Sequence, residues 1–348
     1  MKIDVVTYHL PHPDGTATGR HVFAIWEAVR AMGHDVSAWC WGRVPDDLEP
    51  PSWVKVSHFH DPGGWRRKPA TILRPRGGLA SVGWEPSPDA AVAWAEEPES
   101  YAAVSAAERR GVTIYHSEVL DAIALRRPRP EVVQSVRAER HVVRRAGVAI
   151  TFSPRVARVT GVKNLCPVTL PIPPEPLEVV EEPVAVMIAD WAWRPNQAAL
   201  RRLLDHWSMV REEVAGAKLL IAGRGLTEPI VADGVEVMGE VAQARDALSR
   251  AAVLAFPCPP TSGPKMKVLD ALAWGLPVVT TVAGVEGIKL GEGTVAIADD
   301  DRFFATLVEV LKDPQRRALM AKAGRADVLA GHRPDQAAEA RLKLINQL

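Results

Sequence analysis

The stretch AVLAFPCPPTSGPKMKVLDALAWGLPVVTTVAGVEG, residues 252–287, decides the fold class. An apolar run at 253–256 ends in a proline, and a second run, rich in β-branched residues, covers 277–282; both patterns predict buried strands. Between them, Pro264 suits the first position of a helix and Gly275 suits its end. Strand, helix and strand within about 30 residues form a βαβ unit, which requires a parallel sheet. The chain is therefore expected to be an α/β protein.

The start of the expected helix has the features of an anion site. In a parallel sheet, helix N-termini lie at the edge where ligands bind, and their free N–H groups favour anions. Lys265 and Lys267 add positive charge, and Gly263 leaves the backbone accessible. These features favour a diphosphate as the ligand. A solvated helix start with two ordinary surface lysines fits the same residues.

The segment GPKMKVLDALAWGLPVVTT, residues 263–281, resembles the donor-binding segment of GT-B fold, nucleotide-sugar-dependent glycosyltransferases of the retaining group 1, family 4 type. The Ala-x-Gly-x-Pro-Val-Val core of that segment is kept at 273–279. In the family, one glutamate contacts the transferred sugar and a second, eight positions later, contacts the ribose. The resemblance implies that Asp270 takes the second role, whereas the first position is Ser262, which has no carboxylate. Together with Pro264, these residues indicate donor nucleotide binding more firmly than a sugar contact.

Two further segments of the second half extend the resemblance. Trp-Arg-Pro-Asn at 193–196 is similar to a loop that lies beneath the donor phosphates in the family. Arg194 is thus a candidate second cation, because a guanidinium group forks phosphate oxygens. Without the resemblance, a surface arginine before a helix is the simpler interpretation. Gly239 and Glu240 match a turn that lies beside the nucleotide base in the family.

The N-terminal half opens with a strand at 3–7, a turn-rich loop at 11–19 and a helix from about residue 20. This order resembles the first domain of the same glycosyltransferases, in which the loop faces the cleft between two domains. Gly15 and Gly19 are therefore acceptor-side candidates, because a glycine lets a ligand approach the backbone closely. Glycines that serve only the turn are an equally good interpretation.

A histidine and a glutamate follow the next predicted edge of the sheet. His116 ends a strand expected at 112–116, and Glu118 comes two residues later. Sites are built at the carboxyl ends of parallel strands, so His116 could orient the acceptor hydroxyl or contact the donor phosphates, with Glu118 assisting. A purely structural histidine remains the alternative.

The domain organisation follows from length and proline content. The 348 residues suffice for two domains. Prolines break the pattern at about 167–182, which predicts a linker there. We expect an N-terminal acceptor-side Rossmann-like domain at 1–170, a C-terminal donor-binding Rossmann-like domain at 171–333, and a helix at 334–348 that crosses back to the first domain.

Composition limits the partners and the compartment. The formal net charge is +0, so no global field draws the chain to nucleic acid or to anionic membranes. Basic clusters at 65–68 and 126–129 lie in weakly patterned stretches. They could bind an anionic acceptor, or they could be ordinary solvated surface. Three cysteines without metal-like spacing, no apolar run of membrane-spanning length and no signal-like start lead us to expect a cytoplasmic protein.

The resemblance implies a glycosyltransferase with two doubly wound domains that face each other across a cleft. It implies transfer of a sugar from a nucleotide diphosphate sugar to a hydroxyl of a small-molecule, glycan or lipid-linked acceptor, with retention at the anomeric carbon. We expect no metal and no cofactor, since no Asp-x-Asp loop occurs. A nucleotide-sugar epimerase of the same fold and a catalytically silent scaffold are the alternatives, and a nucleic-acid acceptor is a minority interpretation. Donor sugar, nucleobase, acceptor and oligomeric state stay open.

Overall fold

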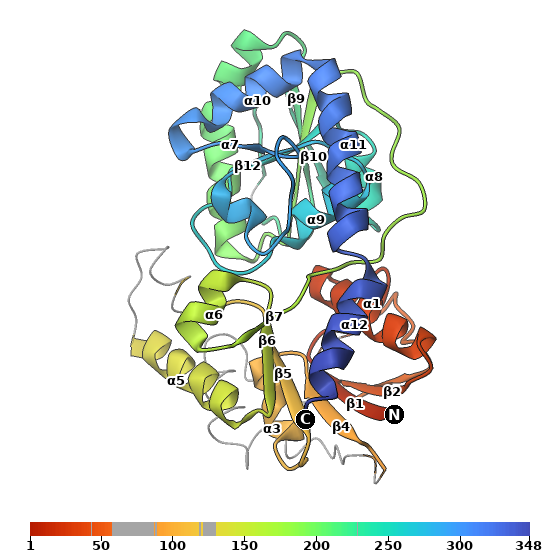
Figure 1. Cartoon of the computed structure of the whole chain (residues 1–348). Coiled ribbons are helices and arrows are strands. Elements are labelled where there is room, and N and C mark those ends of the chain that lie inside the picture. Colours follow the sequence, from red (N-terminus) through yellow and green to blue (C-terminus); the bar gives the residue numbers. More distant parts are fainter. Residues whose placement is uncertain (43, 58–86, 88, 118–119, 121–129, 228) are drawn as a thin grey trace. The chain divides into compact units, whose positions relative to one another are not determined.

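The computed structural model describes residues 1–42, 44–57, 87, 89–117, 120, 130–227 and 229–348 (Figure 1). Its contacts divide the chain into two compact units. The first unit comprises Met1–Pro171, Ser262–Pro264 and Arg333–Leu348, and the second comprises Ile172–Thr261 and Lys265–His332.

The first unit is built on a seven-stranded sheet in which the strands lie in the order β3-β2-β1-β4-β5-β6-β7, and every pairing is parallel. The order reverses at β1 and β4, which are neighbours although two strands separate them in the chain. The strands are β1 (Lys2–Thr7), β2 (Asp35–Cys40), β3 (Val54–Val56), β4 (Val92–Ala95), β5 (Arg110–Ile114), β6 (Val148–Thr151) and β7 (Asn164–Leu165).

Helices of the first unit pack around this sheet. Thr16 begins the first of them by accepting a hydrogen bond from the Gly19 amide, and the C-terminal helix packs against it. The helices are α1 (Ala17–Ala31), α3 (Tyr101–Val104), which follows the short 3₁₀ turn η4 (Pro98–Ser100), α5 (Pro130–Arg145), α6 (Pro154–Thr160) and α12 (Pro334–Ile345).

The second unit repeats the architecture with a six-stranded parallel sheet in the order β10-β9-β8-β11-β12-β13. Its order reverses at β8 and β11. The strands are β8 (Val184–Ile188), β9 (Lys218–Ala222), β10 (Val235–Gly239), β11 (Val253–Phe256), β12 (Val278–Thr280) and β13 (Ala296–Ile297). Between and after them lie α7 (Arg194–Glu213), α8 (Ala244–Leu248), α9 (Met266–Ala273), the 3₁₀ turns η5 (Val282–Val285) and η6 (Asp300–Arg302), α10 (Phe303–Lys312) and α11 (Pro314–Gly331).

The prediction of an α/β fold with two doubly wound parallel sheets is confirmed. Within the stretch that decided it, the first strand has the predicted bounds, and Gly275 follows the helix in a left-handed conformation at φ 73°. The predicted helix start is wrong, because α9 begins at Met266 with Lys265 as its N-cap. Lys265 explains the delay: its ψ of 91° is extended, so helical geometry begins only at Met266.

Two other local predictions differ from the structure. The second strand is shorter than expected and covers only Val278–Thr280, because a 3₁₀ turn begins at Val282. The weakly patterned region before residue 58 contains β3, which pairs with β2 at the sheet edge. The basic clusters at 65–68 and 126–129 lie outside the described residues.

Candidate functional site

The candidate donor site lies in the second unit, where β8 and β11 are neighbours. The chain leaves these two parallel strands in opposite directions, so the loops at their carboxyl ends diverge and form a crevice for ligands. The loop after β8 leads into α7, and the loop after β11 leads into α9. Most of the predicted donor-binding residues come from these two loops and helices.

Lys267 projects from α9 toward the residues that follow β8. Its Nζ donates a hydrogen bond of 2.7 Å to Oδ1 of Asn196 and lies 4.3 Å from the centroid of the Phe256 ring. The side chain as a whole is half-buried, but the ammonium group sits against the aromatic ring. Burial is the main cause that lowers the pKa of Lys267 to about 7, and the charge of Lys265 acts in the same direction. Lys267 thus holds only part of a positive charge at neutral pH.

Asn196 accepts this hydrogen bond, and a second hydrogen bond holds its side-chain amide in place. Its side chain is 3% exposed, and Nδ2 donates 2.8 Å to the carbonyl oxygen of Asp190. This bond orients the amide so that Oδ1 faces Lys267. Sequence reasoning named the motif that contains Asn196 but not Asn196 as a site residue. The sequence did contain a signal for Asn196, because a polar residue in the first turn of a helix at this edge of a sheet is well placed to contact a ligand.

Arg224 joins the loop after β9 to the loop after β8. Its Nε and Nη2 donate to Oδ2 of Asp190 at 3.0 and 2.8 Å, and Asp190 Oδ1 accepts from the Ala192 amide at 3.0 Å. Gly223 makes the approach possible, because a Cβ at this position would lie 1.8 Å from the Ala189 carbonyl oxygen. Sequence reasoning missed Asp190 and Arg224 as a pair.

Lys265 and Asp270 are buried in the second unit rather than exposed. Lys265 is 4% exposed and caps the start of α9, and Asp270 is 5% exposed on the same helix. Close by in the chain, Cys258 is 1% exposed with Sγ 3.8 Å from Thr261 Oγ1. Burial raises the pKa of the Cys258 thiol, and the charge of Lys265 opposes this rise. A buried lysine at a helix start is suited to an anion, because burial strengthens the attraction.

Ser262 and Gly263 make their contacts within the first unit. The Ser262 hydroxyl accepts from the Ser117 amide at 3.0 Å and donates to the Ser117 carbonyl at 3.3 Å. A Cβ on Gly263 would lie 2.3 Å from the Tyr115 carbonyl oxygen, so only glycine fits there. His116, which follows Tyr115, is exposed two residues after the end of β5. The Ser262 hydroxyl is therefore engaged by backbone groups.

The remaining predicted residues are placed as follows. Gly19 is buried, and a Cβ there would lie 2.2 Å from the Leu10 carbonyl oxygen, which gives this glycine a packing role; Gly15 donates 3.2 Å to the His12 carbonyl within the turn. Arg194 is the first residue of α7 and is exposed. Gly239 ends β10 with a φ of 73°, and the next residue, Glu240, is exposed. Pro264 is half-buried. Glu118 lies outside the described residues.

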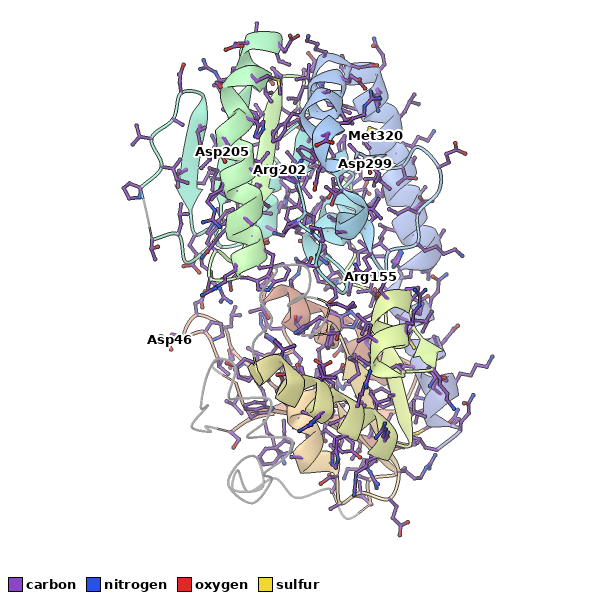
Figure 2. All side chains as sticks on the ribbon, turned by 90° about the vertical axis from the view of Figure 1, so that its left-hand side faces the viewer. Asp46, Arg155, Arg202, Asp205, Asp299 and Met320 are labelled. Carbon is purple, nitrogen blue, oxygen red and sulfur yellow. The ribbon has the colours of Figure 1, made fainter. Side chains whose placement is uncertain are left out.

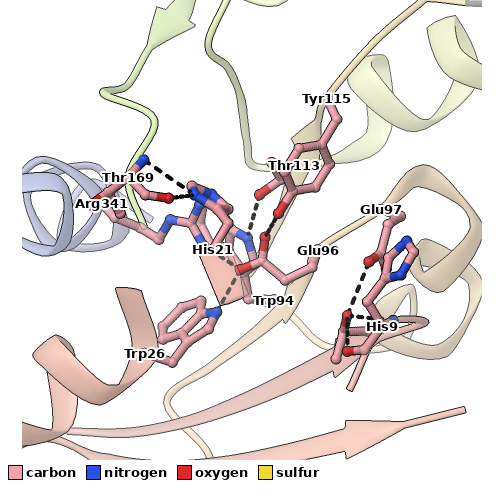
Figure 3. Close-up of polar contacts among 11 residues, drawn as sticks. His9, His21, Trp26, Trp94, Glu96, Glu97, Thr113, Tyr115, Thr169 and Arg341 are labelled. Atoms are coloured by element: carbon pink, nitrogen blue, oxygen red, sulfur yellow. Dashed lines mark hydrogen bonds and ion pairs between the residues drawn. The ribbon is translucent and has the colours of Figure 1, made fainter. Parts of the chain in front are cut away.

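A buried polar cluster that sequence reasoning missed lies at the carboxyl ends of β1 and β4 in the first unit (Figure 3). Glu97 accepts from Thr7 Oγ1 at 3.0 Å, from the Tyr8 amide at 2.9 Å and from Ser100 Oγ at 2.9 Å. Burial raises the pKa of Glu97 to about 8, and the charges of Glu96 and Glu99 add to the rise. Glu97 is thus a carboxyl group that stays largely protonated at neutral pH.

Beside it, Glu96 pairs with a cation from the C-terminal helix. Glu96 accepts hydrogen bonds from Arg341, from Trp26 Nε1 and from the Tyr115 hydroxyl (Figure 3). Both charged side chains of the pair are 0% exposed. The Arg341 guanidinium lies 5.2 Å from the ring centroid of Trp26 and 5.1 Å from that of Trp94, so it packs against both indoles, which also contact each other.

A hollow of about 930 Å³ between α7 and α10 is a separate feature of the second unit. Its lining shares only the prolines at 257, 259 and 260 with the loop that leads to Lys265. Arg202, labelled in Figure 2, forms an ion pair with Asp300 there, and His206 stacks on Phe304 with ring centroids 4.4 Å apart. Since Arg202, His206, Glu213 and Glu309 already have partners, we assign no ligand to this hollow.

The described residues hold no group of three or more His, Cys, Asp or Glu side chains arranged to bind a metal ion. No helix among the described residues combines the length and apolar character needed to cross a membrane.

Comparisons with known proteins bear on both units. Residues 182–313 match the family Glycosyl transferases group 1. No curated protein matches the sequence. Among solved structures, a sucrose-phosphate synthase from Thermosynechococcus elongatus superposes with a TM-score of 0.74 at 16% identity, covering 100% of this chain and 98% of that one.

Two further structures match over nearly the whole chain. HepE from Anabaena, solved in complex with UDP and glucose, gives a TM-score of 0.68 at 12% identity, with 100% of both chains covered. WaaG, a glycosyltransferase involved in lipopolysaccharide biosynthesis, gives 0.67 at 12% identity, with 99% of both chains covered. The domain match and the fold together support an enzyme of the transferase class. The chain thus has the GT-B fold, and its residues 182–313 match the family Glycosyl transferases group 1.

Proposed function

We propose that this protein transfers a sugar from a nucleotide diphosphate sugar to an acceptor hydroxyl, with retention at the anomeric carbon and without a metal ion. The observation that carries the proposal is the contact of Lys267 with Asn196 beside the buried Lys265, where β8 and β11 are neighbours. Two lysines and the N-terminus of α9 supply positive charge at the edge of the sheet where ligands bind. The match of this unit to a glycosyltransferase domain supports the same ligand class.

The chemistry follows from the charge that develops on the leaving diphosphate. Preorganised cations and helix N–H groups stabilise this charge in the transition state, which is the usual main source of catalysis in such a site. Lys265 and Lys267 take this role in the proposal, and Arg194, exposed at the N-terminus of α7, is the further candidate. In the retaining reaction proposed here, the leaving phosphate oxygen receives the proton of the acceptor hydroxyl, so no side chain has to act as a general base.

The donor is the better defined half of the reaction. Asp270 is the proposed partner of the ribose, and Gly239 and Glu240 are proposed to lie beside the base. His116 and Glu118 remain acceptor-side proposals, and a small molecule, a glycan or a lipid-linked hydroxyl is the proposed acceptor. Three free cysteines in the described chain support the cytoplasm as the proposed compartment. The comparisons give no support to the epimerase alternative.

The proposal is tested with a panel of nucleoside diphosphates and their sugars, by thermal unfolding with and without a chelator. A true ligand at 100 times its dissociation constant stabilises the fold by about 2.7 kcal/mol. We expect the shift to be the same in chelator. Incubation with the matching nucleotide sugar should release nucleoside diphosphate only when an acceptor is present, and the anomeric proton coupling of the product should match that of the donor. Formation of an isomeric nucleotide sugar without acceptor would establish an epimerase instead.

A further inference from the structure

The helix α5 of the first unit has two faces of opposite character. Its inner face packs into the unit with the side chains of Ala138 and Val142, both 0% exposed, and with Glu139, which is 1% exposed. From residue 135 onward, the exposed side chains of its outer face are all cationic or titratable: Arg137, Arg140, His141, Arg144 and Arg145. Figure 2 looks onto this outer side, from which nitrogen-tipped side chains project. Successive members of this set are three, one, three and one residues apart, and this spacing places all five in a single stripe along the helix.

These five side chains line an open hollow on the surface of the unit. Its volume is about 340 Å³, and no other described residue lines it. This volume is at the lower end of the range of about 300 to 1,000 Å³ in which small-molecule sites fall. The hollow is therefore large enough for a compact anionic group, and every side chain around it can donate hydrogen bonds to an anion.

The arrangement is unfavourable without an anion. Arg140 and Arg144 are one helical turn apart, as are Arg137 and Arg140, and like charges at these spacings destabilise a helix. Among the described residues, none of these five side chains forms an ion pair with a carboxylate. Arg140 donates a hydrogen bond of 3.4 Å from Nη2 to the Val159 carbonyl oxygen. The helix dipole favours Arg144 and Arg145 in the last turn, but it gives no reason for Arg137 and Arg140. A bound anion would offset the repulsion.

The residue types indicate the anion. Guanidinium groups fork two oxygens of a phosphate, which lysines do not. The sequence of α5 contains no Phe, Tyr or Trp on which a nucleic-acid base could stack. Of its described side chains, Ala138 and Val142 are buried inside the unit, so the described part of the helix has no exposed apolar face to insert into lipid. We propose that the outer face of α5 binds a compact group bearing two or more phosphates. The proposal concerns the first unit alone and does not depend on the proposed donor site.

The test uses inorganic tripolyphosphate as the probe and calorimetric titration as the measurement. The variant Arg140→Gln, Arg144→Gln removes two central guanidinium groups and keeps good helix formers. The matched control Arg211→Gln, Arg316→Gln removes two exposed arginines that already pair with Asp233 and Glu309. The proposed donor site can bind the same probe, so the titrations are analysed for two sites. We expect one of the sites to bind tripolyphosphate at least tenfold more weakly in the α5 variant than in the wild type, since each charged hydrogen bond is worth about a factor of ten. The control should bind as the wild type does.

Hydrogen exchange locates the bound probe. In the wild type, tripolyphosphate should slow the exchange of amides in residues 137–146, and in the α5 variant it should not. Unchanged exchange in α5 together with unchanged affinity in the α5 variant would overturn the proposal, because the phosphate would then bind elsewhere in the chain.

A second arm distinguishes the source of the phosphates. Wild type and α5 variant are sedimented with phosphatidylcholine vesicles that do or do not contain phosphatidylglycerol. Binding to the anionic vesicles that the α5 variant loses would assign lipid headgroups as the source. Tripolyphosphate binding without vesicle binding would assign a water-soluble phosphorylated molecule. Failure of both probes to bind the wild type would overturn the proposal.

Discussion

The ammonium group of Lys267 donates to the amide oxygen of Asn196 across 2.7 Å and thereby joins the helix after β11 to the helix after β8. The two residues are 71 positions apart in the chain, and they meet where the strand order reverses. Asn196 supplies a dipole but no negative charge, so the lysine is oriented without being neutralised. This relationship leaves the ammonium group, which is partly charged at neutral pH, available for an incoming diphosphate.

The first prediction concerns proton uptake. The pKa of Lys267 is lowered to about 7, chiefly by burial, and a bound diphosphate should raise it again. Below pH 7 the lysine is already charged, whereas above pH 7 it must take up a proton when the anion binds. Affinity for nucleoside diphosphate should therefore fall as pH rises above about 7. Titration calorimetry in buffers of different ionisation enthalpy measures the uptake, and Lys267→Met should reduce it by up to one proton. Equal uptake in wild type and variant would contradict the prediction.

The lowered pKa of Lys267 also affects stability. Stability should rise with pH, whereas the affinity for nucleoside diphosphate should fall. Because the folded pKa of Lys267 is below its usual 10.5, the unfolded chain binds more protons between about pH 7 and pH 10. The free energy of unfolding contributed by this residue should rise with pH across that window. Comparison of urea unfolding of the wild type and Lys267→Met over this range checks the sign.

The second prediction tests the neutrality of Asn196. Asn196→Asp keeps the shape but places a carboxylate beside Lys267, which should return the lysine pKa toward its usual range and repel the diphosphate. We expect binding of nucleoside diphosphate to weaken at least tenfold and the pH step near 7 to disappear. The control Asn196→Ala removes the hydrogen bond alone, worth about 1 kcal/mol, and should weaken binding less. A variant with Asp that binds as tightly as the wild type would show that the Lys267 charge does not contact the ligand.

The third prediction separates two glycines that share a positive φ. Gly223 has φ 119°, and a Cβ there would lie 1.8 Å from the Ala189 carbonyl; Gly239 has φ 73° and nothing within 4 Å of such a Cβ. Gly239→Ala should cost only the left-handed backbone energy, about 1 to 2 kcal/mol. Gly223→Ala should cost more, because the loop that carries Asp190 and Asn196 must move. Urea unfolding measures both, and equal losses would show that the close approach does not matter.

The fourth prediction concerns the buried pair in the first unit. Arg341→Met leaves Glu96 buried without its cation, which should cost about 3 to 5 kcal/mol of unfolding free energy. The double variant Arg341→Met, Glu96→Gln removes both charges and should recover most of that loss. Tryptophan fluorescence reports the unfolding, because the guanidinium group packs against Trp26 and Trp94. A double variant less stable than Arg341→Met would contradict the uncompensated charge as the cause.

These features divide into those that local sequence encodes and those that it does not. Local sequence encodes the strand at 253–256, the glycine after α9 and the parallel topology. The spacing of apolar residues and the positions of glycine and proline within a few residues are enough to predict them. The start of α9 was predicted wrongly because Lys265 has an extended backbone, and the segment before it is packed against the carbonyl of Tyr115, which is distant in sequence. Two pairs, Lys267 with Asn196 and Arg341 with Glu96, bring together residues separated by 71 and 245 positions. Such pairs carry no periodic signal, so only the folded chain identifies them.

The last prediction compares Lys265 with Ser262, two positions near the start of α9 whose surroundings differ. Lys265 is buried at the helix N-terminus, and a charged hydrogen bond from it to the leaving diphosphate is worth about 1.5 to 3 kcal/mol, which corresponds to roughly ten- to 150-fold in rate. Lys265→Met keeps much of the side-chain volume and should lower kcat/KM of sugar transfer by that factor. The Ser262 hydroxyl is already engaged by the backbone of Ser117, so Ser262→Ala should lower kcat/KM by less than about tenfold. Steady-state kinetics with the donor identified by the ligand panel measures both. If Ser262→Ala abolishes turnover in a folded protein while Lys265→Met does not, the hydroxyl rather than the lysine acts on the donor.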